Sequence, residues 1–202
     1  QPITQFTNEP IPIGLGLLLD ISDSMFGPRI RDARMAVTQF LTDLIAPTDS
    51  YFVMTFNHAP RLVVPWTSDV ATVGGALEAI RPSGGTSIYD TVIRALPVVA
   101  ARSPERGAIV LISDGADTAS DATLRDVRSA LLRTDAFVFA VAIDSPVRQA
   151  INTRVNPTAL GELTGQSGGH TEVVPDTAEL PGAAARIAQQ LHRQHLLGYA
   201  TP

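Results

Sequence analysis

The chain has 202 residues, of which 45% are hydrophobic and 17% charged, a balance that fits one globular domain with a sizeable core. Its net charge of −5 argues against nucleic acid as a partner, because nucleic-acid-binding domains carry a basic surface. Cysteine is absent, which excludes disulfides, thiolate catalysis and Cys-based zinc sites. All 15 basic residues are arginine, so Walker A loops, Schiff-base enzymes and lysine-dependent phosphate-transfer sites are excluded as well.

The start of the chain predicts a linker. Residues 1–10 are mostly polar and contain two prolines, and no apolar run in the chain approaches the roughly 20 residues that span a bilayer. Since the chain starts at Gln1 without a basic and apolar leader, a signal peptide is absent or already removed, or the sequence is a piece of a larger protein. We favour the last interpretation, and expect the folded domain at residues 11–200.

Strand-like and helix-like segments alternate along the chain. The first half predicts a strand at 13–19, a helix at 28–45, strands at 51–56 and 61–64, and helices at 70–80 and 88–101, the last kinked or begun late by a proline. The second half predicts a strand at 108–112, a helix at 123–132, a strand at 136–143, an irregular loop at 144–157, a helix at 158–164, a strand at 169–174 and a helix at 178–194.

This alternation predicts an α/β fold. The run 13–19 has no charged residue, which is typical of a parallel strand covered by helices on both faces. Only four residues separate 51–56 from 61–64, so these two strands are expected to form a hairpin with one antiparallel strand at the sheet edge. We therefore expect a Rossmann-like, doubly wound, mostly parallel sheet of about six strands with helices on both faces.

Three oxygen-bearing side chains follow the first strand. Asp20 ends it, and Ser22 and Ser24 come at alternate positions in the next loop. In open α/β sheets ligands collect outside the carboxyl ends of strands, and a set of oxygen ligands suits a hard cation such as Mg²⁺. Taken alone, the same residues are better explained as a helix-capping turn.

Two further segments decide between these interpretations. Thr86 follows two glycines and precedes a helix, and Asp114 follows the buried strand 108–112. The whole set resembles the von Willebrand factor A domain with its metal-ion-dependent adhesion site, whose pattern is Asp-x-Ser-x-Ser, then a threonine after glycines, then an aspartate after a buried strand. All five positions match, at Asp20, Ser22, Ser24, Thr86 and Asp114. Segments 85–90, 112–118, 163–169 and 196–199 resemble a bacterial branch of the family found mostly in exported or multi-domain proteins.

The resemblance implies a binding site. It implies that Ser22, Ser24 and Thr86 bind Mg²⁺ directly, with Mn²⁺ or Ca²⁺ as alternatives, while Asp20 and Asp114 act largely through waters and hydroxyls. An acidic side chain of a partner protein then fills the open position on the cation, as in cell adhesion. The bacterial branch also implies a secreted or otherwise extracytoplasmic protein, with no membrane insertion by this segment.

Three more residues are candidates for the rim or the second layer of the site: Asp23, Asn57 and Asp117. Asp23 stands where many relatives have glycine, and Asn57 lies in a turn that could bridge loops beside the site. The plainer interpretation is a solvated loop charge for Asp23 and a turn or helix cap for Asn57 and Asp117.

Three functions remain open from the sequence. The first is a protein-interaction module that depends on the cation, and the second is a scaffold or assembly domain whose metal site is structural or vestigial. The third is an enzyme such as a metal-dependent hydrolase, which the missing lysine and the lack of a clustered general base disfavour. We therefore expect that the protein is not an enzyme.

Overall fold

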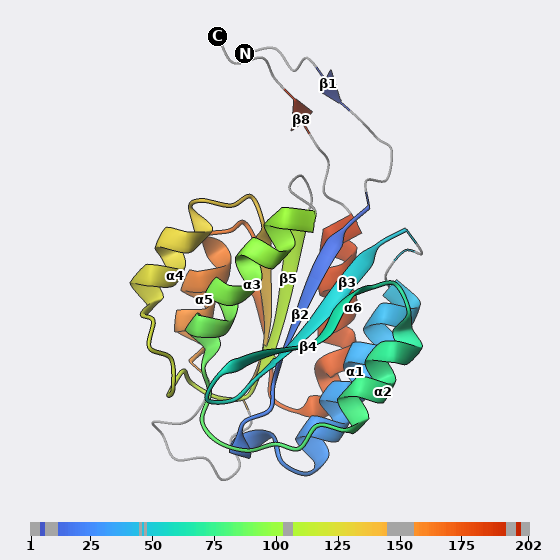
Figure 1. The fold of residues 1–202 in the computed structure, drawn as a ribbon, viewed down its shortest axis with the longest axis vertical. Helices are drawn as coiled ribbons and strands as arrows, with labels where there is room; N and C mark the ends of the chain where they lie inside the picture. Colours follow the sequence, from blue (N-terminus) through green and yellow to red (C-terminus); the bar gives the residue numbers. More distant parts are fainter. Residues whose placement is uncertain are drawn as a thin grey trace.

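A computed structural model describes residues 5–6, 12–44, 46, 48–102, 107–144, 156–192 and 197–198. Its centre is a six-stranded sheet in the order β4-β3-β2-β5-β6-β7, with helices on both faces (Figure 1). The β3–β4 pair is antiparallel and every other pair of this sheet is parallel. The strands are β2 (Gly14–Asp20), β3 (Ser50–Phe56), β4 (Pro60–Thr67), β5 (Gly107–Ser113), β6 (Phe137–Ile143) and β7 (Thr171–Val174).

The helices form two layers, one on each face of the sheet. One layer holds α1 (Pro28–Leu44), α2 (Val70–Glu78) and α6 (Leu180–His192), and the other holds α3 (Ile88–Arg102), α4 (Leu124–Leu131) and α5 (Pro157–Gly165). Two short 3₁₀ helices, η1 (Asp23–Met25) and η2 (Thr177–Glu179), precede α1 and α6. Within the described residues, no helix is both long and apolar enough to cross a bilayer.

Strand β2 shows how the sequence builds these layers. Its residues alternate between the two cores: Leu15, Leu17 and Leu19 pack towards α1 and α6, whereas Leu18 packs towards α3. Gly16 lies on the α3 face, where a Cβ atom would come within 2.6 Å of the Phe52 ring. The glycine in an otherwise apolar strand is therefore explained by the ring that fills its side-chain space.

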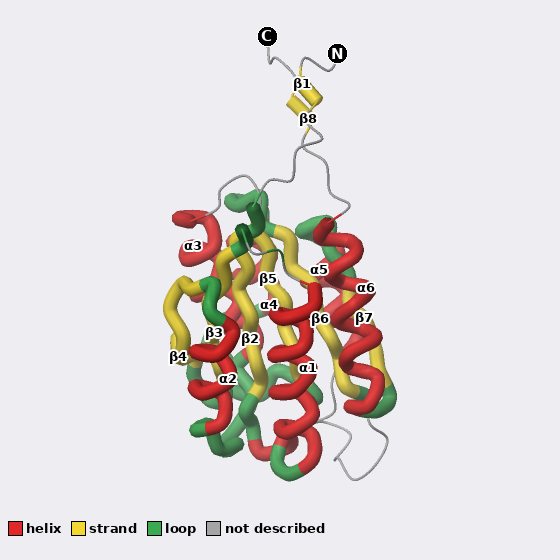
Figure 2. Tube along the Cα trace, turned by 90° about the vertical axis from the view of Figure 1, so that its right-hand side faces the viewer, coloured by secondary structure: helices red, strands yellow, loops and turns green. Residues whose placement is uncertain are grey.

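A separate two-stranded sheet joins the two ends of the chain. Strands β1 (Gln5–Phe6) and β8 (Leu197–Gly198) pair antiparallel and lie beyond the end of the six-stranded sheet (Figure 2). The sequence pattern did not predict this pairing, because each strand has only two residues. The expected linker at residues 1–10 and the irregular loop at 144–157 lie almost wholly outside the described residues.

The predicted fold class is confirmed, and the differences are local. Strand β4 runs to Thr67, three residues beyond its predicted end, because Tyr51 pairs with Thr67 across an irregular register. Helix α3 begins at Ile88 with Pro97 inside it, so the expectation of a late start is wrong. Helix α6 begins at Leu180, because Thr177–Glu179 form η2 first.

Candidate functional site

The carboxyl ends of β2, β3 and β5 lie side by side at one edge of the sheet, which we call the carboxyl edge. Strand β2 lies between β3 and β5, so the chain leaves its carboxyl end where the strand order reverses. The Gly-rich loop before α3 is fixed on the loop after β2 by two backbone bonds: the Asp23 N–H donates to the Gly84 carbonyl at 3.0 Å, and the Ser83 N–H to the Ile21 carbonyl at 2.8 Å. The loop after β5 joins them, because the Thr118 N–H donates to the Thr86 carbonyl at 2.9 Å. The three predicted loops therefore meet.

Asp20 is fully buried at the centre of this edge. Its Oδ1 accepts the Ser22 backbone N–H at 2.8 Å, and its Oδ2 accepts the Ser113 hydroxyl at 2.5 Å. Burial raises the pKa of the Asp20 carboxyl to about 7, although the hydrogen bonds from Ser113 and Ser22 oppose this shift. Ionisation of Asp20 therefore lowers the stability of the folded state unless a positive charge lies close to the carboxylate.

The two serine hydroxyls form a cluster with the second carboxylate. The Oγ atoms of Ser22 and Ser24 are 3.0 Å apart, and the Ser24 hydroxyl donates to Asp114 Oδ1 at 2.6 Å. Neighbouring oxygen ligands of an octahedral cation at ~2.1 Å stand about 3.0 Å apart, so the serine spacing fits adjacent positions around Mg²⁺. The residues present therefore fit a hard divalent cation.

Asp114 is held from its other side by an arginine. Its carboxylate is fully buried, and Arg29 Nη1 donates to Oδ2 at 2.8 Å while the same nitrogen donates to the Ser24 carbonyl at 2.9 Å. Burial raises the pKa of Asp114, and the hydrogen bond from Ser24 and the charge of Arg29 oppose that rise. Arg29 is the second residue of α1, so the helix start places a positive charge beside the cluster.

Thr86 is anchored by its backbone and leaves its hydroxyl available. Its N–H donates to Thr118 Oγ1 at 3.1 Å, and its carbonyl accepts the N–H groups of Thr118 and Ala119 at 2.9 and 3.1 Å. Within the described residues the Thr86 hydroxyl makes no hydrogen bond, and the residue is only 5% exposed. Gly84, at φ +80°, provides the turn that brings this loop to the carboxyl edge.

The three rim candidates have different positions. Asp117 caps α3, because its Oδ2 accepts the Tyr89 N–H at 3.0 Å and the Ser120 hydroxyl at 2.6 Å. Asn57 keeps its turn bond to the Ala59 N–H at 3.4 Å, and its amide also donates to Ser83 Oγ at 3.3 Å, so it links the β3–β4 turn to the Gly-rich loop. Asp23 is exposed beside the cluster.

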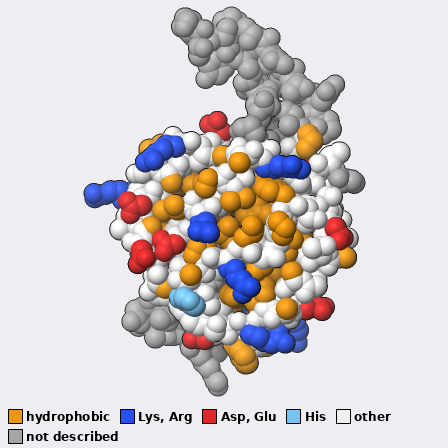
Figure 3. Space-filling view, in the orientation of Figure 1, with side chains coloured by type: hydrophobic (Ala, Val, Ile, Leu, Met, Phe, Trp, Pro, Cys, Tyr) orange, Lys and Arg blue, Asp and Glu red, His pale blue; other side chains and the backbone are white. Residues whose placement is uncertain are grey.

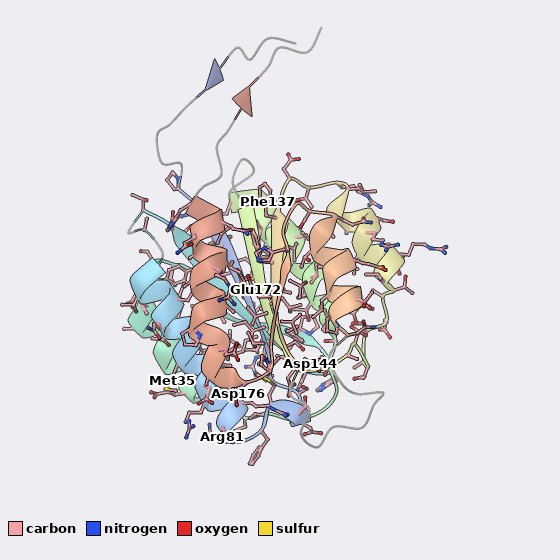
Figure 4. All side chains as sticks on the ribbon, turned by 180° about the vertical axis from the view of Figure 1, so that it is seen from behind. Met35, Arg81, Phe137, Asp144, Glu172 and Asp176 are labelled. Carbon is pink, nitrogen blue, oxygen red and sulfur yellow. The ribbon has the colours of Figure 1, made fainter. Side chains whose placement is uncertain are left out.

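Two other acidic residues lie towards the same end of the molecule as the cluster. Asp144 follows β6 and Asp176 precedes η2, and Figure 4 shows both at the lower end of the molecule. Asp176 serves as a helix cap that accepts the Ala178 N–H at 3.0 Å. Across the described residues, no three His, Asp or Glu side chains gather into a metal-binding group. Cation binding here would therefore depend on the hydroxyl oxygens as much as on the two carboxylates.

The sequence pattern missed two residues of the cluster. Ser113 holds Asp20 through its hydroxyl, and Arg29 holds Asp114 through its guanidinium. Ser113 could have been found from its place beside Asp114 at the end of a buried strand. Arg29 gave a weaker signal, since one basic residue in a first helical turn is ordinarily a surface charge.

Comparisons with known proteins place the chain in a family. Residues 15–116, just over half of the chain, match the family described as von Willebrand factor type A domain. Inter-alpha-trypsin inhibitor heavy chain H2 of Mus musculus is 30% identical over an alignment of 132 residues that covers 59% of this chain and 14% of the mouse protein. The chain thus spans about a seventh of the length of the curated relatives it matches.

Two solved structures show the same fold at low sequence identity. A von Willebrand factor type A protein from Catenulispora acidiphila superposes with a TM-score of 0.76 at 17% identity, over 90% of this chain and 43% of that one. Proximal thread matrix protein 1 of the mussel byssus, solved with a zinc-occupied metal-ion-dependent adhesion site, has a TM-score of 0.74 at 14% identity, over 90% and 46%. Domains of this family act generally as protein-interaction and adhesion modules, and they commonly bind a divalent metal. This chain belongs to the von Willebrand factor type A domain family.

Proposed function

We propose that this domain captures an acidic side chain of a partner protein through a divalent cation held by Asp20, Ser22, Ser24, Thr86 and Asp114. The observation that carries the proposal is the cluster of Ser22, Ser24 and Asp114 oxygens, 3.0 and 2.6 Å apart. Thr86 follows two residues after Gly84, whose carbonyl accepts the Asp23 N–H at 3.0 Å. When bound, the cation supplies a Lewis-acidic centre with a coordination position that a carboxylate can fill.

The chain's own residues prepare this centre. Neutral hydroxyls from Ser22, Ser24 and Thr86 would contact the cation without cancelling its charge. The two carboxylates would supply negative charge from behind, where Asp20 is held by Ser113 and Asp114 by Arg29. An all-oxygen set with several neutral ligands favours Mg²⁺, with Mn²⁺ and Ca²⁺ as alternatives. The zinc in the mussel protein adds Zn²⁺ to the panel worth testing.

The surroundings of the cluster suit a protein as partner. Phe26, two residues after Ser24, is 74% exposed and offers an apolar contact beside the cation site. On the face seen in Figure 3 the arginines are spread out rather than gathered into one basic stripe, which argues against nucleic acid. We retain the expectation of a secreted or extracytoplasmic domain at residues 11–200 of a larger protein as part of the proposal.

Metal binding is tested first. Calorimetric titration with Mg²⁺ and Mn²⁺ is expected to give one site in the wild type, and Thr86→Val is expected to weaken it by about tenfold or more. The matched control is Thr42→Val on α1. The Thr42 side chain is exposed and its hydroxyl donates to the Thr38 carbonyl, so its removal should leave metal affinity unchanged. A wild type that takes up neither cation overturns the proposal.

Capture of a carboxylate is tested second. Peptides are selected from a random display library on the Mg²⁺-loaded domain, and each selected peptide is remade with its Asp and Glu residues changed to Asn and Gln. Binding should require one particular carboxylate and should disappear in EDTA. Binders that tolerate both the acidic substitutions and EDTA would instead support binding on another surface.

A second candidate function is favoured by the Arg29–Asp114 ion pair. A guanidinium 2.8 Å from a buried carboxylate already neutralises part of the charge that a cation would neutralise. This arrangement suits a scaffold or assembly domain in which the cation site is structural or vestigial. The metal titration identifies a vestigial site, which binds no cation and loses nothing in Thr86→Val. A structural site binds the cation but gives no carboxylate-dependent binding in the peptide experiment.

A further inference from the structure

Arg29 connects two of the five residues proposed to hold the cation. One nitrogen, Nη1, donates both to Asp114 Oδ2 at 2.8 Å and to the Ser24 carbonyl at 2.9 Å. The side chain is 21% exposed, whereas the carboxylate it binds is fully buried. The guanidinium therefore lies between the interior of the site and its rim.

The contact fixes which oxygen of Asp114 faces the hydroxyls. Oδ2 is taken by Arg29, and Oδ1 accepts the Ser24 hydroxyl at 2.6 Å. A plain explanation is that Arg29 only stabilises the fold, since a buried carboxylate without a partner is costly. That explanation predicts a loss of stability when Arg29 is substituted. It does not predict that the affinity for the cation rises while the affinity for a carboxylate falls.

The charge balance of the site points to a second role. Asp20 and Asp114 are buried acidic residues of the cluster, and the Arg29 guanidinium lies 2.8 Å from the Asp114 carboxylate. Removal of Arg29 therefore makes the site more negative by one charge, both before and after a divalent cation binds. Charges only a few ångströms apart in a partly buried site interact strongly. The charge of Arg29 therefore affects both the binding of the cation and the binding of a carboxylate to the loaded site.

We propose that Arg29 is a specificity-determining residue of the cation site, which lowers the affinity for the cation and raises the affinity of the loaded domain for a carboxylate. The inference rests on the proposed function and deepens it, because it names a residue that selects an anionic partner group. Arg29 acts through the field at the site and through the position of Asp114, not as a cation ligand.

The test uses Arg29→Gln, which removes the charge but keeps an amide that can donate to the Ser24 carbonyl. Arg29→Lys is the control, since it keeps the charge and changes the shape. Calorimetry with Mn²⁺ should give about tenfold tighter binding in Arg29→Gln than in the wild type, with Arg29→Lys close to the wild type. Glutarate binding to each Mn²⁺-loaded protein, followed by paramagnetic line broadening of the glutarate signals, should weaken by about tenfold in Arg29→Gln.

The opposite directions of the two changes distinguish the proposal from a structural role. Weaker binding of both Mn²⁺ and glutarate in Arg29→Gln, or no change in either, overturns the inference while the proposed function stands. No Mn²⁺ binding by any of the three proteins overturns both. If Arg29→Gln is unfolded, Arg29→Met is tested by thermal unfolding with and without Mn²⁺. A larger Mn²⁺-induced rise in Tm in Arg29→Met than in the wild type supports the inference, and an equal or smaller rise overturns it.

Discussion

The two ends of the sheet bury aspartates in different ways. At the amino end Asp49 is 4% exposed, and its two oxygens accept the backbone N–H groups of Ile13 and Ala46 at 2.8 and 3.0 Å. At the carboxyl edge Asp20 and Asp114 accept serine hydroxyls at 2.5 and 2.6 Å. A backbone donor is fixed and can only satisfy the anion, whereas a hydroxyl can rotate and offer its lone pairs to a cation.

From this difference we expect the amino end to contribute to stability, and the carboxyl edge to carry the proposed binding site. Both ends contain buried carboxylates, so burial alone does not mark the candidate site. What marks it is a serine hydroxyl that donates to each carboxylate of the carboxyl edge, in addition to the Ser22 N–H on Asp20 and the Arg29 guanidinium on Asp114. Substitutions at the amino end should lower stability without changing cation affinity. Substitutions at the carboxyl edge should change both stability and cation affinity.

Asp20→Asn should show the largest effect, and its sign depends on pH and cation. The folded-state pKa of Asp20 is raised from 3.8 to about 7, so the folded protein holds this proton more tightly than the unfolded chain. In chelator, the contribution of Asp20 to stability is therefore present below about pH 4 and is lost as pH rises through 7. At 1.36 kcal/mol per pKa unit the loss is roughly 4 kcal/mol, and Asn escapes it because an amide does not ionise.

Urea unfolding at pH 5 and pH 8, with EDTA or with Mn²⁺, measures this effect. In EDTA at pH 8 the Asn variant should be the more stable protein, and Mn²⁺ should reverse the order by stabilising the wild type alone. A wild type whose difference from the variant does not change between pH 5 and pH 8 would contradict the assignment to Asp20.

Asp49→Ala should come second, with a loss of about 3 kcal/mol, because the N–H groups of Ile13 and Ala46 lose their acceptor in a buried position. Equilibrium urea unfolding gives the loss, and calorimetry should give an Mn²⁺ affinity equal to that of the wild type. Asp49→Asn, which keeps one acceptor oxygen, should lose less. A changed Mn²⁺ affinity in either variant would show that the two ends are coupled.

Asp117→Ala and Asp69→Ala form a matched pair of helix-cap removals. Each should lower stability, by about 1 kcal/mol for Asp117. Asp69 caps α2, where it accepts the Ala71 and Thr72 N–H groups at 3.0 and 3.3 Å, and Asp117 caps α3 through the Tyr89 N–H at 3.0 Å. Only the Asp117 change should also weaken Mn²⁺ binding, because α3 follows directly on Thr86. Amide hydrogen exchange at Tyr89 should become faster in Asp117→Ala. Equal Mn²⁺ affinities in the two variants would contradict the proposed difference between the two ends of the sheet.

Much of the fold could be predicted because its signals are local. The uncharged run before Asp20 and the alternation of strands with helices were enough to predict a doubly wound sheet. The position of Gly16 could not be predicted, since it depends on the Phe52 ring of a neighbouring strand. The β1–β8 pairing was also missed, because two residues per strand leave no periodic pattern.

The candidate site also contains residues that the sequence could predict and residues that it could not. Asp20, Ser22 and Ser24 lie within one short loop, and Thr86 and Asp114 carry recognisable neighbours in the sequence. Arg29 and Ser113 act through contacts 85 and 93 residues away along the chain, to Asp114 and Asp20, so only the fold reveals what they do. The metal ligation itself stays a prediction that the substitutions above test.

Asp23→Asn should have the smallest effect. It compares an exposed carboxylate of the carboxyl edge with the two buried ones. Asp23 is exposed, and within the described residues its carboxylate makes no hydrogen bond or ion pair. Its backbone N–H donates to the Gly84 carbonyl at 3.0 Å, and its carbonyl accepts the Phe26 N–H at 3.3 Å. Stability should stay within about 0.5 kcal/mol of the wild type, as for most surface changes. Water and salt screen an exposed charge, so Mn²⁺ affinity should fall by no more than about twofold, and the fall should vanish at high ionic strength. A tenfold fall in Mn²⁺ affinity that persists in high salt would place Asp23 in contact with the cation, and the distinction between buried and rim carboxylates would have to be redrawn.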